Sequence, residues 1–374
     1  MRFSILLPTR NGAEYLPGAI ASVLDQNGDF ELVVADNANT DATPEILESR
    51  ADDPRLRVVH SSEVIPVTKN WMSALRAARG DYLLMIGDDD LLLPGFFDRV
   101  DAILKRHDDP DCLTFDGYSY VAPGSFSADA PALWSPRHFD TRRLGPEREL
   151  TQKERVGIVR DMFRFRVRYP LNMQLTLFSR SALDSVPGDV FRAPFPDHFA
   201  LNSLLLRARR FVVTNERLLV IGVSPKSFGH YFYSGHQVQG LRYLGSDSTF
   251  PGRIEGSELV NSTYAWLTEL RRTYPEVATV PIDRWQYIIR QVNHWYRQVE
   301  FGKLPVSALG ARARSLRWWE IAPAMVAVLG YRVVGRLRTR VAGRARTYTS
   351  DAWPSLRETP HRTITAFAKD LSPA

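Results

Sequence analysis

The chain has 374 residues and contains little of what several protein classes require. Its single cysteine, Cys112, excludes an intramolecular disulfide and a cysteine-based zinc site, and it fits a reducing, cytoplasmic location. The apolar run at residues 1–7 stops at Pro8, before a signal-peptide core could be completed. Another apolar run, at residues 318–334, is uninterrupted for only about fourteen residues, which is too short to span a bilayer. The sequence therefore predicts neither a secretory leader nor a membrane-spanning helix.

Positive charge is concentrated in the C-terminal part of the chain. Residues 301–374 contain thirteen Lys or Arg against four Asp or Glu, a net charge of +9, whereas the whole chain carries +6 and residues 1–300 therefore carry −3. This asymmetry predicts an anionic partner for the C-terminal segment, such as the inner face of the cell membrane. Nucleic acid is not expected, because no zinc-finger, helix-turn-helix or RNA-binding signature accompanies the arginines.

Short apolar runs alternate with helical patterns in the first third of the chain. The runs with strand character are residues 3–7, 30–35, 56–59 and 82–86. Between them, apolar residues recur at helical spacing, as Leu16, Ile20 and Val23 do. This β-α-β-α order predicts an α/β fold of Rossmann-like type, with a mostly parallel sheet covered by helices on both faces.

The remainder of the chain predicts more sheet and then helices. Further strands are expected at residues 112–115, 171–178 and 211–223. Residues 122–150 lack periodicity and predict long loops, whereas an apolar stripe at residues 285–299 predicts a long helix. We expect a main domain over residues 1–250 and a helical C-terminal extension with a basic tail over residues 251–374.

Three consecutive carboxylates, Asp88, Asp89 and Asp90, follow the apolar run at residues 82–86 and Gly87. Side chains two apart on extended backbone point the same way, so Asp88 and Asp90 are expected to converge on one cation. Carboxylate oxygens suit Mg²⁺ or Mn²⁺, and these ions hold phosphates well. The alternative is a solvated acidic loop that caps the following helix. We favour the metal site because a buried strand leads directly into the cluster.

Polar side chains also follow the ends of two other expected strands. Thr9, Arg10 and Asn11 follow the first strand, and Asp36 follows the second. The carboxyl ends of parallel strands meet at one edge of a sheet, where ligands of such sheets bind. Helix capping would explain Asp41 but leaves Asp36 without a role. The sequence therefore predicts one ligand site that combines these residues with the acidic cluster.

Three motifs carry a resemblance to a known family: residues 4–11 with the segment 22–26 that follows them, residues 33–43, and residues 70–90. In this order they resemble the opening of the family 2 glycosyltransferases, which are inverting enzymes with the GT-A fold. The resemblance fades beyond Phe115. It implies a nucleotide-sugar-binding half at residues 1–115 and an acceptor-binding half at residues 116–250.

The resemblance implies roles for the residues that bind the donor. Pro8 and Thr9 would wall the pocket of the nucleotide base, with Asn11 beside them, and Asp36 would accept a hydrogen bond from the base. Lys69 would assist the diphosphate. A UDP-sugar is the first expectation for the donor, and dTDP- or GDP-sugars are the alternatives.

The resemblance also implies a metal-dependent centre that uses Mn²⁺ or Mg²⁺. Asp90 would bind the metal, Asp88 would contact the ribose or a metal-bound water, and Asp89 would lie in the donor site. A histidine further along the chain, His230, would be an additional metal ligand, with His236 as its competitor.

The catalytic base is expected where Pro196 and Asp197 open an apolar helix. By resemblance Asp197 would take the proton of the acceptor hydroxyl, although Pro at the first position with a neighbouring Asp is also an ordinary helix start. Asp116 is the reserve candidate for the base, and His198 is a candidate acceptor contact. The acceptor would be a glycan or a lipid-linked saccharide in cell-surface assembly.

Two other functions stay open at this stage. A sugar-phosphate nucleotidyltransferase would also combine a Rossmann-like sheet, a nucleotide and Mg²⁺, but it would carry a glycine-rich loop after the first strand, and residues 8–12 are not one. A non-catalytic, membrane-associated scaffold would give no purpose to four acidic residues next to a core.

Overall fold

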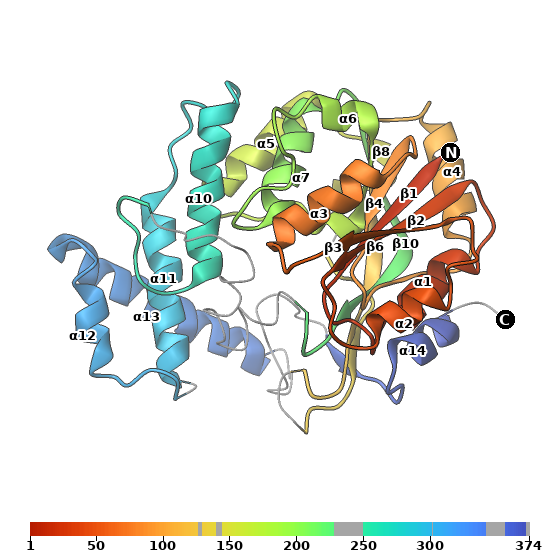
Figure 1. The fold of residues 1–374 in the computed structure, drawn as a ribbon. Coiled ribbons are helices and arrows are strands. Elements are labelled where there is room, and N and C mark those ends of the chain that lie inside the picture. The colour runs from red at the N-terminus through yellow and green to blue at the C-terminus, as the bar shows by residue number, and fades with distance from the viewer. Residues whose placement is uncertain (126–128, 140–143, 228–249, 301, 342–355, 372–374) are drawn as a thin grey trace.

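The computed structural model describes residues 1–371 except 126–128, 140–143, 228–249, 301 and 342–355 (Figure 1). Its strands are β1 (Phe3–Thr9), β2 (Phe30–Asn37), β3 (Leu56–Ser61), β4 (Tyr82–Met85), β5 (Leu91–Leu92), β6 (Cys112–Val121), β7 (Leu133–Ser135), β8 (Arg148–Glu149), β9 (Thr176–Ser179), β10 (Phe211–Val223) and β11 (Arg357–Glu358). Its helices are α1 (Leu16–Leu24), α2 (Thr43–Glu48), α3 (Val67–Ala77), α4 (Phe96–Arg106), α5 (Gln152–Met162), α6 (Arg180–Asp184), α7 (Pro196–Arg207), α10 (Glu258–Thr273), α11 (Arg284–Glu300), α12 (Ala308–Ala313), α13 (Trp318–Val341) and α14 (Ile364–Leu371), and residues Met173–Leu175 form the 3₁₀ turn η2.

One sheet organises the main body, in the order β11-β7-β6-β9-β4-β1-β2-β3, with β10 paired to β5, β6 and β8. The long pairings are parallel and join β1 to β2 and β4, β2 to β3, and β6 to β10. The antiparallel pairings each join only two or three residues per strand. The prediction of an α/β fold with a mostly parallel sheet is therefore confirmed.

Each predicted strand is present in the structure, and one of them begins later than predicted. The runs in the first third of the chain form β1 to β4, and residues 211–223 form β10. The expected strand at residues 171–178 begins only at Thr176, because the side chain of Asn172 accepts a hydrogen bond from the Gln174 backbone N–H (2.9 Å) and starts the turn η2. The predicted loop at residues 122–150 contains the short strands β7 and β8.

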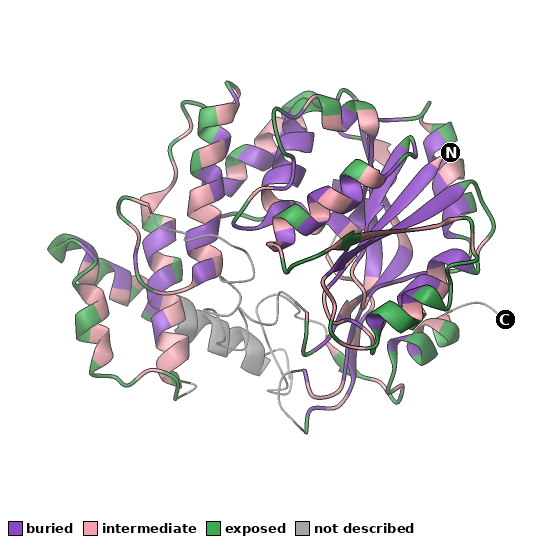
Figure 2. Cartoon of the chain, viewed as in Figure 1, coloured by how far each residue is buried: buried purple, intermediate pink, exposed green. Residues whose placement is uncertain are grey.

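The central strands of the sheet are buried, whereas β3 at its edge is partly exposed (Figure 2). Ile5 and Leu7 of β1 pack into a cluster with α1 and α4, whereas Leu6 between them packs into a cluster with α3 and α7. This alternation follows from the two-residue period of a strand and explains why β1 is almost continuously apolar. The strand ends, in contrast, carry the polar side chains.

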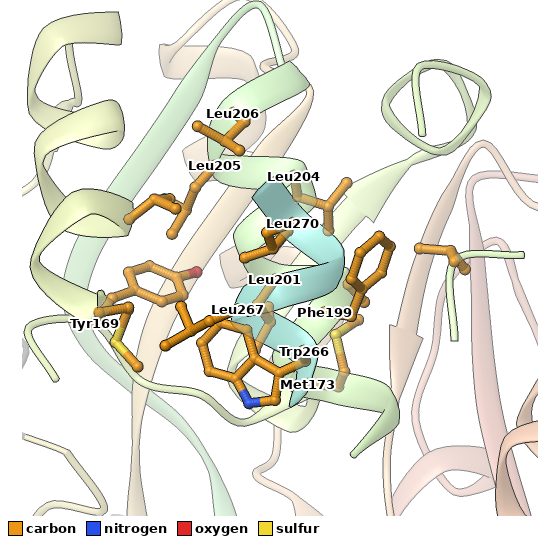
Figure 3. Close-up of a cluster of buried hydrophobic side chains, with 14 of the residues drawn as sticks. Tyr169, Met173, Phe199, Leu201, Leu204, Leu205, Leu206, Trp266, Leu267 and Leu270 are labelled. Carbon is orange, nitrogen blue, oxygen red and sulfur yellow. The ribbon is translucent and has the colours of Figure 1, made fainter. Parts of the chain in front are cut away.

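Helix α10 packs on α7 and continues the core of the main body (Figure 3). Its Trp266, Leu267 and Leu270 are at most 1% exposed and belong to the same buried cluster as residues of α7, namely Phe199, Leu201, Leu204, Leu205 and Leu206. The core is therefore continuous across residue 250, where we predicted a domain boundary from the sequence. The boundary stays a prediction.

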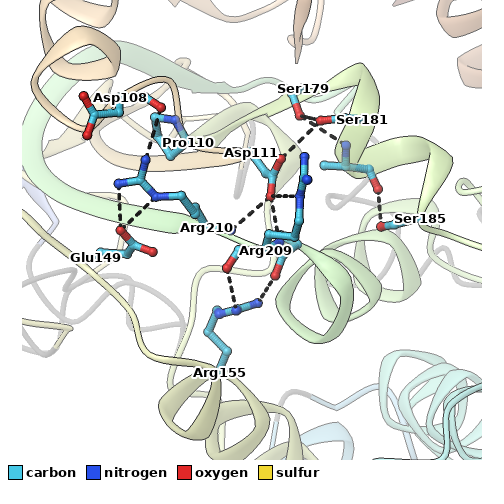
Figure 4. A network of polar contacts seen from close by, with 12 residues as sticks. Asp108, Pro110, Asp111, Glu149, Arg155, Ser179, Ser181, Ser185, Arg209 and Arg210 are labelled. Atoms are coloured by element: carbon cyan, nitrogen blue, oxygen red, sulfur yellow. Dashed lines mark hydrogen bonds and ion pairs between the residues drawn. The ribbon is translucent and has the colours of Figure 1, made fainter.

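Two charged side chains fix the C-terminal end of α7 (Figure 4). Arg155 on α5 is 3% exposed and donates hydrogen bonds to the carbonyl oxygens of Ala208 (2.5 Å) and Arg209 (3.2 Å). The Asp111 carboxylate accepts from the backbone N–H groups of Arg209 (2.7 Å) and Arg210 (3.0 Å). Carbonyl groups at the C-terminal end of a helix lack hydrogen-bond donors within the helix, and Arg155 provides donors to the carbonyls at the end of α7. These contacts hold α7 in its direction.

The remaining helices attach in two ways. Ala324 and Val328 of α13 are fully buried against the cluster that contains α11, and Glu320 of α13 accepts two hydrogen bonds from the Arg284 guanidinium (2.8 and 3.0 Å). Helix α14 returns to the sheet, where Phe367 packs with Leu91 and Val220. Among the helices that the structure describes, none has both the length and the apolar character needed to cross a bilayer.

Candidate active site

A cavity of about 1070 Å³ lies where the predicted site residues come together. Pro8 and Asn11 line it from the end of β1, Asp88, Asp89 and Asp90 from the end of β4, and Asp197 from the start of α7. Further lining residues come from the end of β10 and from the C-terminal helices, namely Gly222, Lys226, Ser227, Leu259, Val260, Thr263 and Arg290. The cavity is thus lined by residues from both halves of the main body.

The acidic cluster forms a tight turn. The Asp90 backbone N–H donates to the Gly87 carbonyl (3.3 Å), and the two Asp90 carboxylate oxygens accept the backbone N–H groups of Gly87 (2.6 Å) and Gly222 (2.9 Å). Asp90 is only 1% exposed. Its carboxylate therefore ties the turn to β10, and each oxygen has a further lone pair besides the one that accepts a backbone N–H.

Asp88 is held by the end of β1. Its carboxylate accepts a hydrogen bond from the Thr9 hydroxyl (2.6 Å), and a Cβ atom on Gly12 would lie only 2.0 Å from the same oxygen. Glycine at position 12 is therefore required for this contact. The expectation that Asp88 and Asp90 share one side of an extended segment is wrong, because the turn replaces the two-residue alternation.

Asp89 faces the segment that follows β10. Its carboxylate accepts from the Ser227 hydroxyl, and the Ser227 hydroxyl in turn accepts the Ser224 backbone N–H (2.7 Å). A Cβ atom on Gly87 would lie 3.0 Å from one Asp89 carboxylate oxygen and 3.1 Å from one of Asp90, so these two oxygens meet over the glycine. The turn thus concentrates carboxylate oxygens in a space that a larger side chain would fill.

Burial and mutual repulsion make the three carboxylates reluctant to ionise. Burial, with repulsion from Asp89, raises the pKa of Asp88 to about 7 and that of Asp90 to about 8. Burial also raises the pKa of Asp89. Hard carboxylate oxygens next to uncompensated negative charge fit a divalent cation. Within the described residues, however, no three His, Cys, Asp or Glu side chains are placed so that they could hold a metal ion by themselves.

Asp36 reaches the cavity indirectly. It is 6% exposed and accepts from the backbone N–H (3.0 Å) and the side-chain amide (2.6 Å) of Asn39, while its second oxygen contacts His60 Nδ1 (2.9 Å). The Asn39 side-chain oxygen accepts the backbone N–H of Asn11, which lines the cavity. Asp36 therefore lies on the same side of the sheet as the acidic turn, one residue layer behind the cavity wall.

Asp197 occupies the first turn of α7, after Pro196 at the helix start. Burial raises its pKa. One carboxylate oxygen accepts the His198 backbone N–H (3.0 Å), and His198 Nε2 lies 4.0 Å from the same oxygen. The His198 ring stacks on Phe195 (5.0 Å between centroids), and among the described residues its Nδ1 atom has no hydrogen-bond partner. Both Asp197 and His198 line the cavity.

Four other candidates are not among the residues that the structure places at the cavity. Lys69 is exposed on α3 and is not among the described residues that line the cavity. Asp116, the reserve base, is fully buried and pairs with Arg137 (2.7 Å). His230 and His236 lie outside the described residues.

The sequence analysis missed Lys226 and Ser227, which follow β10 and line the cavity. The Lys226 ammonium lies 3.5 Å from the Asn11 carbonyl oxygen and 3.9 Å from the Glu14 carboxylate. Its positive charge lowers the pKa of Asp88, against the larger effect of burial. The position of Lys226 directly after a predicted strand was the signal that could have identified it.

The sheet order and the covering helices define an α/β fold of GT-A type, with the candidate site at the carboxyl ends of its strands. The structure is similar to the crystal structure of Staphylococcus aureus TarS 1–349 in complex with UDP-GlcNAc, with a TM-score of 0.52 and 16% identity over 84% of this chain and 80% of that one. At this identity the likeness establishes the fold alone.

Residues 4–167 match the model of the family named Glycosyl transferase family 2. A PGL/p-HBAD biosynthesis glycosyltransferase of Mycobacterium bovis is 34% identical over 117 residues, which are 30% of this chain and 46% of the relative. The abequosyltransferase RfbV of Salmonella typhimurium is 30% identical over 97 residues, 25% of this chain and 29% of the relative. The resemblance to glycosyltransferase family 2 that the motifs predicted is therefore confirmed over residues 4–167, and the chain spans only about half the length of the first relative and less of the second.

The raised pKa of Asp88 predicts how stability depends on pH. The folded chain holds the protonated carboxyl better than the unfolded chain does, so stability is lost as the pH rises from the ordinary value of 3.8 to about 7. Asp88→Asn removes this loss while the Thr9 hydroxyl keeps an acceptor. With metal ions chelated, we expect the melting temperature of the variant to lie a few degrees above that of the natural chain at about pH 8. At about pH 4 the two melting temperatures should differ little.

The measurement is calorimetric melting in chelator across this pH range. Asp52→Asn, which changes an exposed aspartate, is the matched control and should follow the natural chain at each pH. A variant that melts lower than the natural chain at about pH 8 would contradict the proposed repulsion within the turn.

Proposed function

We propose that this protein is an inverting, metal-dependent glycosyltransferase that moves a sugar from a nucleoside diphosphate donor to an acceptor hydroxyl in cell-surface glycan or glycolipid assembly. The observation that carries the proposal is the position of the acidic turn and Asp197 on one cavity. The match of residues 4–167 to the family 2 model supports it, as do two relatives with glycosyltransferase names. A UDP-sugar is the first choice of donor, since the TarS structure holds UDP-GlcNAc, and dTDP- and GDP-sugars are the alternatives.

The nucleoside of the donor would bind at the end of β1. Pro8 and Asn11 would contact it directly, because they line the cavity, whereas Thr9 would act through its hydrogen bond to Asp88. Asp36 would hold the Asn11 segment through Asn39 and reach the base only if that segment moves aside. The Asp88 carboxylate oxygen that Thr9 does not occupy would accept a hydrogen bond from the ribose.

The diphosphate would bind opposite the acidic turn. Asp88 and Asp90, which both line the cavity, would hold Mn²⁺ or Mg²⁺, with Asp89 beside them and His230 as the predicted additional ligand. When bound, such an ion neutralises the charge that develops on the diphosphate leaving group. Lys226, whose ammonium lies at the cavity wall, would contribute a second positive charge. We therefore propose Lys226 in place of Lys69 as the lysine that assists the diphosphate.

The proton of the acceptor hydroxyl would pass to Asp197. The hydroxyl oxygen attacks the anomeric carbon from the side opposite the diphosphate, the carbon–oxygen bond to the diphosphate breaks, and the configuration inverts. A carboxylate whose pKa is raised by burial is a stronger base than an exposed one, so the environment of Asp197 suits this step. Asp116 is unsuited to it because its ion pair with Arg137 occupies it in the core.

The acceptor would be a glycan or a lipid-linked saccharide that enters beside α7 and α10. An acceptor of this kind is consistent with a location at the inner face of the cell membrane, which the basic C-terminal segment favours. A nucleotidyltransferase or a non-catalytic scaffold is less well supported, because neither would need a half-buried carboxylate at the start of α7 on the same cavity as the acidic turn.

The two lysines provide a matched test of diphosphate binding. Lys226→Ala should weaken binding of a UDP-sugar or of UDP by about tenfold, since it removes a charge at the cavity, and should weaken uridine binding little. Lys69→Ala should change neither. Titration calorimetry with UDP and with uridine measures the affinity of each variant for both ligands. If Lys69→Ala weakened UDP binding more than Lys226→Ala did, the assignment of Lys226 would be wrong.

The base assignment predicts a separation between binding and turnover. Asp197→Asn keeps an oxygen for the His198 backbone N–H but cannot accept the proton, so kcat should fall by about 10²- to 10⁴-fold with the Kd for UDP unchanged. Calorimetry and a transfer assay on the same preparations test this. A variant with near-natural turnover, or one that no longer binds UDP, would contradict the role of Asp197.

A further inference from the structure

Helix α13 has two apolar faces, and only one of them is covered. Ala324 and Val328 are buried against the α11 cluster. The other face, which we call the α13 apolar face, consists of Trp318 (79% exposed), Trp319 (53%), Val326 (69%) and Leu329 (50%). At 3.6 residues per turn these four positions fall within a stripe of about 100° and extend over about 16 Å of helix.

The exposure of this face is unusual for the chain. Nine large apolar residues are exposed in the part of the chain that the structure describes, and four of them form the α13 apolar face. Scattered apolar residues on a surface need no explanation, but a contiguous set that includes two tryptophans marks an interaction site. Because the opposite face of α13 is already packed, the protein's own core does not account for the stripe.

The surroundings of the face are strongly basic. Arg314 and Arg317 are exposed at its N-terminal end, and the Arg317 guanidinium lies 5.5 Å from the centre of the Trp319 ring. The sequence of the same helix continues with four further arginines, Arg332, Arg336, Arg338 and Arg340. Its one acidic residue, Glu320, is 6% exposed and pairs with Arg284. The charge next to the face is therefore of one sign.

We propose that the α13 apolar face is inserted into the headgroup region of an anionic membrane, with the helix lying in the plane of the surface. Tryptophan side chains favour this region, and arginines beside them attract lipid phosphates. A second copy of this chain is a poorer occupant, because it would bring another C-terminal segment with a net charge of +9 to the same place.

The proposal does not depend on catalysis, but it has a consequence for the proposed function. Helices α10 and α11, which belong to the same buried cluster as α13, contribute Leu259, Val260 and Arg290 to the cavity wall. A membrane bound through α13 would therefore be anchored to the helices that line the acceptor side. If the proposed function also holds, a lipid-linked acceptor is favoured over a free glycan.

Flotation of the full chain with vesicles, without donor or metal, tests the proposal. We expect binding to phosphatidylcholine vesicles that contain phosphatidylglycerol, weaker binding at high salt, and at least tenfold weaker binding to vesicles of phosphatidylcholine alone, which is about the loss expected when attraction to the basic residues is removed. Trp318→Ser with Trp319→Ser should reduce partitioning into the anionic vesicles by about tenfold or more, and Arg314→Glu with Arg317→Glu should do the same at low salt only.

A pair of valines supplies the matched control. Val326→Ser on the face should weaken vesicle binding measurably, whereas Val64→Ser, at a valine that is 55% exposed before α3, should not. Unchanged melting temperatures would verify that each variant is folded. The proposal would be overturned if the tryptophan variant and the natural chain bound anionic vesicles equally well. It would also be overturned if the natural chain did not bind these vesicles. A dimer in solution that the tryptophan variant abolishes would instead assign the face to a second copy and likewise overturn it.

Discussion

The placement of three neighbouring carboxylates beside an apolar core is the constraint on which the site depends. Buried negative charges of one sign repel each other and lose hydration, and a chain accepts this cost only where donors or a cation offset it. Here peptide N–H groups of Gly87 and Gly222 and the hydroxyls of Thr9 and Ser227 offset part of the cost. The raised pKa values of Asp88 and Asp90 indicate that the rest is not offset by the protein alone.

The donors that hold the turn tie together distant parts of the chain. Thr9 lies at the end of β1 and Gly222 at the end of β10, so the acidic turn forms only when both strands are in place. Glycine is needed at positions 12 and 222, because a Cβ atom would lie 2.0 Å from the Asp88 carboxylate and 1.8 Å from the Asp89 carbonyl oxygen. The base candidate is positioned by similar means, since Arg155 and Asp111 fix the far end of α7. The site is thus a product of the whole main body.

The fold was largely predictable from the sequence, because apolar periodicity reports burial directly. Strands β1, β2 and β4 were recognisable because both of their faces are covered and their sequences are nearly continuous in apolar residues, and β10 was recognisable from two apolar runs. The start of β9 was not, because a single hydrogen bond from Gln174 to the Asn172 side chain converts the preceding residues into a 3₁₀ turn. Local polar contacts of this kind leave no trace in hydropathy.

The sequence predicted the residues of the candidate site better than it predicted their arrangement. Asn11, Asp88 and Asp197 line the cavity as expected. The periodicity argument nevertheless failed for the acidic cluster, because it assumes extended backbone where the chain turns. Asp36 lies behind the wall and Lys226 on it, and both positions depend on long-range packing that no local pattern encodes.

The central claim is that the acidic turn binds the nucleotide through a divalent cation. Titration calorimetry of UDP with and without Mn²⁺ tests this claim most directly. The account predicts that UDP binds at least about tenfold more tightly with Mn²⁺ than in chelator, and that Asp88→Asn and Asp90→Ala each abolish this difference. Equal affinity of the natural chain for UDP in Mn²⁺ and in chelator would contradict it.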